Sequence, residues 1–211
     1  MKTICILGAS GMAREAGDVA WALGVTPIYV TNDPGEIAAW RFPERIASEA
    51  DIDELTGYPF VIGIGENAIR EKIALRLSGR VRFVNLIHPS ATFGHMQREA
   101  VEAQAGVIVC AGARLTSGIS VGDFSIINQN ATVAHDVIVE EFVHVAPQAC
   151  VSGNVRLGRG CWIGAGAVVN QGGNQRKLTV GARTVIGSGA VVTEDCVADA
   201  VYVGVPAKRV T

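Results

Sequence analysis

The stretch that decides the fold is residues 109–169, VCAGARLTSGISVGDFSIINQNATVAHDVIVEEFVHVAPQACVSGNVRLGRGCWIGAGAVV. Every sixth residue in it is aliphatic: Val109, Leu115, Val121, Ile127, Val133, Val139, Val145, Val151, Leu157, Ile163 and Val169. A period of this kind is typical of a repeat whose units stack into a solenoid, because each unit needs its neighbours to bury its aliphatic residues.

Strand geometry explains the period of six. Two inward positions separated by one outward position make a short strand, and the other residues turn a corner. Small or polar residues such as Gly122, Asn128, Gly158 and Gly164 stand at these corners. Three units would close a triangular coil of about eighteen residues, with coils stacked about 4.8 Å apart. The period breaks at residues 170–179, so the segment 171–175, QGGNQ, predicts a loop outside the solenoid.

The N-terminal part has a different pattern, in which strands and helices alternate. Segments 3–7, 27–31, 60–64 and 81–87 have the pattern of strands, and 12–23 and 68–77 that of helices, with Asn67 as the cap of the second helix. This alternation predicts a parallel sheet covered by helices. We therefore expect an α/β Rossmann-like domain over residues 1–90 and a parallel β-helix over residues 91–211, in which 96–105 favours a helix.

The composition excludes several classes of protein. The chain has 211 residues and a net charge of −2, so it lacks the basic balance of nucleic-acid binders. No apolar run approaches the about 20 residues of a membrane span. Five cysteines without a C-x-x-C spacing argue against a disulfide framework and a zinc knot. We expect a cytoplasmic protein with a large apolar core and no metal.

Five motifs follow one another along the chain: Gly8-Ala9-Ser10-Gly11, the segments GIGEN (63–67) and IHPSA (87–91), His135-Asp136, and VGVPAKR (203–209). In this order they resemble the sialic-acid O-acetyltransferase and nucleotide-4-aminosugar N-acetyltransferase family of hexapeptide-repeat acyltransferases, over nearly the whole chain. The resemblance implies a left-handed β-helix, acetyl-CoA as co-substrate, a sugar acceptor and a homotrimer.

Acyl transfer from a thioester needs a base for the acceptor and a donor for the developing oxyanion. His135 falls at a repeat corner beside Asp136, and the resemblance implies that His135 is the base. Asp136 would then orient the imidazole. Adding one coil of about eighteen residues to His135 leads to Gly153, whose N–H is the candidate oxyanion donor. A glycine needed only for corner dihedral angles is the alternative.

The resemblance also implies residues that bind acetyl-CoA. His144 stands at an outward position on a flat face, with Trp162 one coil away, and is expected to contact the cofactor. Corners with small side chains leave room for the narrow pantetheine arm, although tight turns also favour small residues. The other expected cofactor residues are Gly164, Ala165, Gly187, Ser188 and Lys208.

The acceptor is expected in the N-terminal domain, where the glycine turn places backbone N–H groups at a helix start, which favours anions. The residues that the resemblance assigns to it are Ser10, Gly11, Met12, Asn32, Asp33, Gly65 and Asn67, with Asn128 from a β-helix corner. Two positions depart from the family pattern. Met12 stands where the family often has His, and Asn32-Asp33 where it often has paired aspartates.

The expected function is acetyl-CoA-dependent N-acetylation of a nucleotide-linked 4-amino sugar, for bacterial surface glycans. The alternative is O-acetylation of sialic acid or a related sugar. Two other classes fit less well. The turn at Gly8 lacks the G-x-G-x-x-G pattern of dinucleotide-binding dehydrogenases. A metal site of the β-helix carbonic anhydrase type needs three imidazoles, and the solenoid offers His135 and His144.

Overall fold

The N-terminal domain is built on a five-stranded parallel sheet with the strand order β3-β2-β1-β4-β5. The computed structural model describes residues 2–210. The strands are β1 (Lys2–Leu7), β2 (Val25–Val30), β3 (Ile46–Ala47), β4 (Pro59–Ile62) and β5 (Arg82–Phe83). The parallel pairing confirms the α/β domain that the alternating pattern predicts.

Four α-helices accompany this sheet: α1 (Gly11–Ala22), α2 (Pro34–Ala39), α3 (Ile52–Leu55), which follows a 3-10 turn at Glu49–Asp51, and α4 (Asn67–Leu77). The prediction that Asn67 caps α4 is wrong. The cap is Glu66, whose carboxylate accepts the Ala68 N–H at 3.4 Å. Among residues 2–210, no helix is long and apolar enough to cross a membrane.

The strand expected over 81–87 is divided between the two domains. β5 joins the N-terminal sheet, whereas β6 (Leu86–Ile87) pairs with β8 (Ile108–Val109) in the β-helix. The β-helix therefore begins just before the expected division after residue 90. The helix expected within 96–105 is α5 (Gln97–Glu102).

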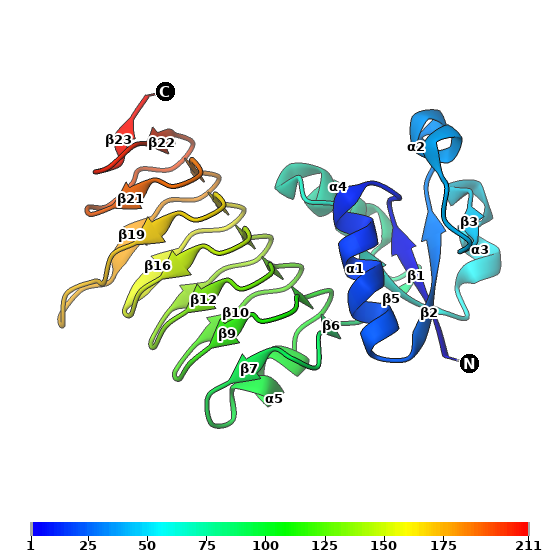
Figure 1. Cartoon of the computed structure of the whole chain (residues 1–211), viewed down its shortest axis with the longest axis horizontal. Coiled ribbons are helices and arrows are strands. Elements are labelled where there is room, and N and C mark those ends of the chain that lie inside the picture. The colour runs from blue at the N-terminus through cyan, green and yellow to red at the C-terminus, as the bar shows by residue number, and fades with distance from the viewer. Residues whose placement is uncertain (1, 211) are drawn as a thin grey trace.

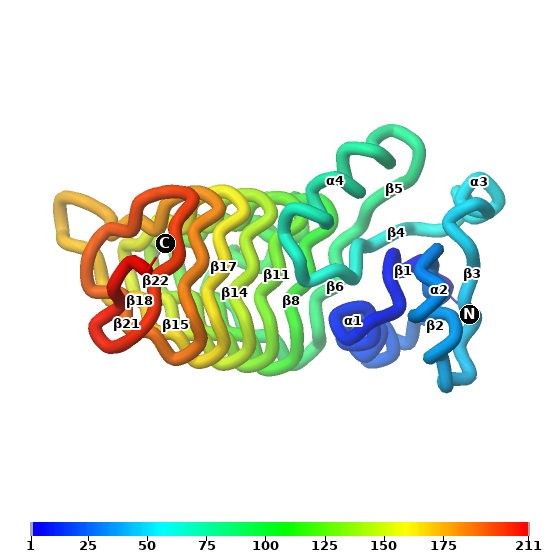
Figure 2. Tube along the Cα trace, turned by 90° about the horizontal axis from the view of Figure 1, so that it is seen from above, coloured from blue at the N-terminus to red at the C-terminus, as the bar shows by residue number. Residues whose placement is uncertain are grey.

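The second domain is a left-handed parallel β-helix with three faces, and its stacked coils are visible in Figures 1 and 2. The eight-strand face contains β6, β8, β11 (Ile126–Ile127), β14 (His144–Val145), β17 (Trp162–Ile163), β20 (Val185–Ile186), β22 (Val201–Val203) and β23 (Lys208–Arg209). The six-strand face contains β7 (Thr92–Phe93), β9 (Arg114–Leu115), β12 (Thr132–Val133), β15 (Cys150–Val151), β18 (Val168–Val169) and β21 (Val191–Val192). The four-strand face contains β10 (Ser120–Val121), β13 (Ile138–Val139), β16 (Val155–Leu157) and β19 (Leu178–Val180).

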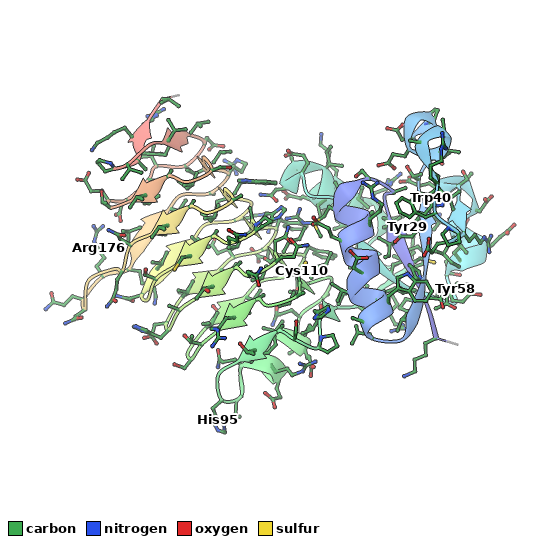
Figure 3. The ribbon with its side chains drawn as sticks, in the orientation of Figure 1. Tyr29, Trp40, Tyr58, His95, Cys110 and Arg176 are labelled. Atoms are coloured by element: carbon green, nitrogen blue, oxygen red, sulfur yellow. The ribbon has the colours of Figure 1, made fainter. Side chains whose placement is uncertain are left out.

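The predicted repeat is confirmed residue by residue. All eleven periodic positions from Val109 to Val169 are buried. The coil length is eighteen residues, since His144 pairs with Ile126 on one side and with Trp162 on the other. Residues 170–177 leave the coil between β18 and β19, as the break in the period predicts. Arg176 in this loop points away from the N-terminal domain in Figure 3.

The two domains meet where α1 packs on the eight-strand face (Figure 1). Met12 and Ala16 of α1 share one buried apolar cluster with Ile108, Cys110 and Ile126 of the β-helix. Cys110 lies on the side of the β-helix that faces α1 in Figure 3. Outward residues of this face are therefore covered, and the face is not open to solvent at these coils.

Arg70 of α4 joins the domains through polar contacts. Its side chain is fully buried and donates to five acceptors: the carbonyls of Ile64, Gly65, Phe124 and Phe142 and the Asn67 Oδ1. Burial lowers the pKa of Arg70 to about 9, so the guanidinium is still charged at neutral pH. Phe124 and Phe142 belong to two successive β-helix corners, so one side chain ties both corners to the N-terminal domain.

Candidate active site

His135 occupies an exposed corner between the six-strand and four-strand faces. Its Nδ1 lies 2.8 Å from Asp136 Oδ2, and the two side chains are 50% and 61% exposed. Asp136 has a φ of 59°, a left-handed conformation that Asp tolerates better than most residues. Because the carboxylate accepts the Nδ1–H, the lone pair of Nε2 is free to take a proton.

Gly153 lies one coil from His135, as expected, and its role there is to leave space. A Cβ at position 153 would collide with the His135 ring. Gly153 is absent from the positive-φ glycines of the chain, so corner dihedral angles do not explain it. Its carbonyl accepts the Gly172 N–H at 3.0 Å, whereas its own N–H has no acceptor within residues 2–210. The Gly153 N–H therefore stays the candidate oxyanion donor beside the His135 ring.

Replacing Gly153 by alanine is expected to lower kcat about 100-fold and leave the KM for acetyl-CoA unchanged. The added methyl group displaces the imidazole, and a displacement of about 1 Å is enough for a loss of this size. Steady-state kinetics checks it, with Gly57→Ala as the control, since no atom lies within 4 Å of a Cβ at position 57. An unchanged kcat in Gly153→Ala would contradict this role.

A hollow of about 540 Å³ surrounds the His135 corner. Its wall includes Asn154 and Lys177, which sequence reasoning missed. The Lys177 ammonium donates to the Asp136 carbonyl and, at 3.0 Å, to Asn154 Oδ1. Lys177 reaches this corner because the loop 170–177 returns beside it. The break in the six-residue period was the one signal that this loop exists, and it did not indicate where the loop ends.

His144 lies on the eight-strand face as predicted, but the N-terminal domain covers it to 3% exposure. Its Nδ1–H donates to the Gly65 carbonyl at 3.2 Å, and its Nε2 accepts the Asn128 amide at 3.3 Å. Burial, with the nearby Arg70 charge, lowers the pKa of His144 to about 4, so its ring is neutral at pH 7. Trp162 packs on it with 4.2 Å between ring centroids.

Three residues expected at the acceptor meet His144 in this seam. A Cβ at Gly65 would lie 3.6 Å from His144 Cε1 and 3.9 Å from Met12 Cβ. The Asn128 amide lies 3.9 Å from Met12 Sδ. The structure thus groups His144 with Met12, Gly65 and Asn128, rather than with the other residues expected to bind acetyl-CoA. We call these four residues the seam cluster.

Two other residues expected at the acceptor have structural contacts. The Asn67 amide donates to the carbonyls of Gly160 and Cys161 at 2.9 and 3.0 Å, so Asn67 joins the two domains. Asn32 Oδ1 accepts from the Ser48 hydroxyl and the Glu49 N–H, both at 2.9 Å. Both side chains therefore make hydrogen bonds within the protein. A sequence motif alone does not distinguish such a structural contact from a contact with a ligand.

A carboxylate of the chain itself, that of Glu36, already occupies the glycine turn. Glu36 of α2 accepts the Ala9 N–H at 3.0 Å, at the place where the sequence predicts an anion-binding turn. Ser10 and Gly11 are exposed beside it and line a hollow of about 280 Å³ together with Trp40 and Phe42. A phosphate at this turn would therefore meet a carboxylate already in place.

Asp33 holds the helix that carries Glu36. Its Oδ1 accepts the N–H groups of Gly35 and Glu36 at 2.7 and 3.2 Å, which makes it the N-cap of α2. Asp33 itself is exposed, so the rest of its carboxylate faces solvent.

The small corners expected to bind pantetheine lie along one edge, between the eight-strand and six-strand faces. A Cβ at Gly164 would lie 2.6 Å from the Ile186 carbonyl oxygen, so this glycine is needed for coil stacking. Ala165 and Ser188 are exposed on this edge, Gly187 lies directly above Gly164, and Lys208 is exposed on β23 at its end. Asn128 belongs to the same edge, two coils before Gly164. The edge therefore connects the seam cluster with the expected cofactor residues.

The His135 corner lies on a different edge of the triangular β-helix. No hydrogen bond or ring contact within the described part of the chain joins His135 to the seam cluster. One chain therefore holds two candidate half-sites: the His135–Asp136 pair beside Gly153 on one edge, and the seam cluster with the small corners on another. Among residues 2–210, no group of three His, Cys, Asp or Glu side chains could hold a metal ion.

Comparison with known proteins finds two matches to parts of the chain. Residues 3–77 match the PglD N-terminal domain. The GDP-perosamine N-acetyltransferase of Escherichia coli O157:H7 is 31% identical over 126 residues, which are 58% of this chain and 54% of that protein. The chain thus aligns with about half the length of this curated relative.

Solved structures match over the whole chain. The acetyltransferase domain of PglB from Neisseria gonorrhoeae FA1090 has a TM-score of 0.84 and 26% identity, with 100% of both chains covered. The same domain is also known in complex with acetyl coenzyme A, with a TM-score of 0.85. PerB from Caulobacter crescentus, in complex with CoA and GDP-perosamine, has a TM-score of 0.84 and 27% identity, covering 100% of this chain and 98% of that one.

Proposed function

We propose that this chain belongs to the nucleotide-aminosugar N-acetyltransferase family of hexapeptide-repeat acyltransferases and transfers the acetyl group of acetyl-CoA to the amino group of a nucleotide-linked 4-amino sugar. The observation that carries the proposal is the His135–Asp136 pair with the imidazole lying against Gly153. The relatives that bind GDP-perosamine supply the class of acceptor. Acetyl-CoA and nucleotide sugars are cytoplasmic metabolites, so we place the reaction in the cytoplasm.

In the proposed mechanism His135 Nε2 removes a proton from the acceptor amine as its nitrogen attacks the thioester carbonyl carbon. Asp136 stabilises the imidazolium that forms. The Gly153 N–H donates to the oxyanion of the tetrahedral intermediate. When that intermediate collapses, the C–S bond breaks, the CoA sulfur receives the proton from His135, and the amide product leaves.

The two half-sites support a homotrimer. A threefold axis repeats one heterologous contact, which sets one edge of each β-helix against a different edge of its neighbour. The His135 edge of one subunit would then face the small-corner edge of the next, and acetyl-CoA would lie between them. We expect light scattering to give three times the chain mass of 22.1 kDa. Full activity at a dilution where the protein is monomeric would contradict this arrangement.

Asp33→Ala is expected to raise the acceptor KM about 5- to 150-fold, the range for loss of one hydrogen bond, with the KM for acetyl-CoA unchanged. The reason is that Asp33 lies in the N-terminal domain, away from the cofactor edge. Asp33→Asn is the matched variant, because an Asn side chain still caps α2. Parallel changes in both KM values would show that Asp33 does not act on the acceptor alone.

The experiment that tests the function is a thiol-release assay with a panel of acceptors. The panel contains UDP-, dTDP- and GDP-linked 4-amino sugars, the matching 4-hydroxy sugars and free sialic acid. We expect acetyl-CoA-dependent release of CoA with a 4-amino sugar nucleotide and N-acetyl product by mass spectrometry. Turnover of sialic acid alone would replace the N-acetyltransferase proposal by O-acetylation.

A further inference from the structure

The seam cluster has an acidic neighbour that the mechanism above does not use. Glu15 of α1 is half-buried, one helical turn after Met12, and its Oε2 lies 3.5 Å from the Asn128 amide nitrogen. That contact is at the long end of hydrogen bonding. Within residues 2–210 no Lys or Arg forms an ion pair with Glu15. Glu15 is thus a carboxylate beside the cluster without a cationic partner.

The seam cluster beside Glu15 carries no positive charge, and the neighbouring Arg14 directs its guanidinium to the Ala9 carbonyl and the Phe42 ring. His144 is neutral, and Asn128 offers an uncharged amide. Asp18, one turn further along α1, is an exposed carboxylate without a hydrogen bond to the seam cluster within residues 2–210. The guanidinium of Arg70 is buried near His144, and its hydrogen bonds go to carbonyls and to Asn67. The carboxylate of Glu15 therefore favours a cation beside the seam cluster.

The proposed acceptor brings such a cation. An alkyl amine has a pKa well above 7, so the amino sugar arrives mainly as an ammonium ion at neutral pH. A carboxylate that holds this ion would bind the acceptor with its nitrogen next to Asn128 and His144. The ammonium then loses one proton to the surroundings before attack, and the second N–H proton goes to His135 Nε2 of the adjoining subunit.

We propose that Glu15 recognises the protonated amino group of the acceptor and selects a 4-amino sugar over its 4-hydroxy counterpart. This inference rests on the proposed function, and it adds a residue that discriminates between acceptors. The neutral Met12 beside it fits the same assignment, because a histidine there would compete with the ligand for the carboxylate when protonated.

The test is calorimetry with two ligands: the nucleotide 4-amino sugar that the acceptor panel turns over fastest, and the same nucleotide sugar with a 4-hydroxyl group. We expect wild type to prefer the amine, and Glu15→Gln to lose about 10- to 100-fold in affinity for it, the range for a charge-assisted hydrogen bond. Affinity for the hydroxyl ligand should stay within about threefold. Asp18→Asn is the matched control and should change neither, and Glu15→Asp should keep the preference.

Other outcomes separate the two proposals. If Glu15→Gln weakens both ligands equally, or neither, while wild type still turns over the amine, the Glu15 inference is wrong and the N-acetyltransferase proposal stands. If wild type neither binds nor acetylates any nucleotide 4-amino sugar, both are wrong. Thermal unfolding of each variant checks that a loss in binding is not a loss of fold, and Glu15→Asp tests the charge should Glu15→Gln be unstable.

Discussion

Replacing His135 by alanine should lower kcat by about two to four orders of magnitude, the usual contribution of a general base, and leave the fold intact. The side chain is half exposed at a corner, so its loss opens no cavity in the core. The variant keeps the Gly153 N–H, so some acceleration over the uncatalysed reaction should remain. Stopped assays of amide formation at saturating acetyl-CoA give the value.

His95→Ala is the control for this prediction. His95 lies on the loop before α5 and is exposed at the end of the β-helix distant from the C-terminus (Figure 3). Its replacement should leave kcat unchanged. A His135→Ala enzyme with more than half of wild-type activity would remove His135 from the mechanism, and transfer would then depend on positioning and on amine deprotonated in solution.

Replacing Arg70 by methionine should destabilise the protein by about 3–5 kcal/mol, although Arg70 makes no contact with the proposed reacting atoms. Methionine fills similar space but leaves the carbonyls of Phe124 and Phe142 without their donor in a buried place. Each unsatisfied buried group costs about 1–3 kcal/mol. We expect a lower urea midpoint at a fixed protein concentration, with the N-terminal domain separating from the β-helix first.

Arg76→Met is the matched control on the same helix. Arg76 is half exposed and pairs with Glu49 at 2.8 Å, so its replacement should cost less than about 1 kcal/mol. Equal midpoints for Arg70→Met and wild type would show that the seam relaxes around the substitution. Arg70 and His144 both donate to the Gly65 carbonyl. Loss of Arg70 should therefore also raise the acceptor KM.

The β-helix was predictable because its signal is local and repeated. Eleven buried aliphatic positions report the same geometry, and a coil of fixed length converts sequence spacing into contact, as in the pairs of His144 with Ile126 and Trp162. The same arithmetic placed Gly153 beside His135. The His135–Asp136 contact was predictable because the two residues are adjacent at one corner.

The contacts between the domains were not predictable in this way, because they join residues far apart in the chain with no period between them. His144 has an outward position by its repeat, and only the packing of α1 and α4 on that face buries it and makes it neutral. Asn67 and Asp33 stand at motif positions, yet their hydrogen bonds go to β-helix carbonyls and to the start of α2.

The sequence by itself determined the coil, its register, the presence of a loop at 171–175 and the partners along each edge, since strand geometry allows one stacking for that period. Only the tertiary structure decided which face the N-terminal domain covers, and therefore that Glu15, Met12, Gly65, Asn128 and His144 lie together while His135 stands on another edge. The physical reason is that burial of an apolar face depends on the shape and fit of two folded surfaces. The sequence of a single strand or helix does not specify which surface will pack against it.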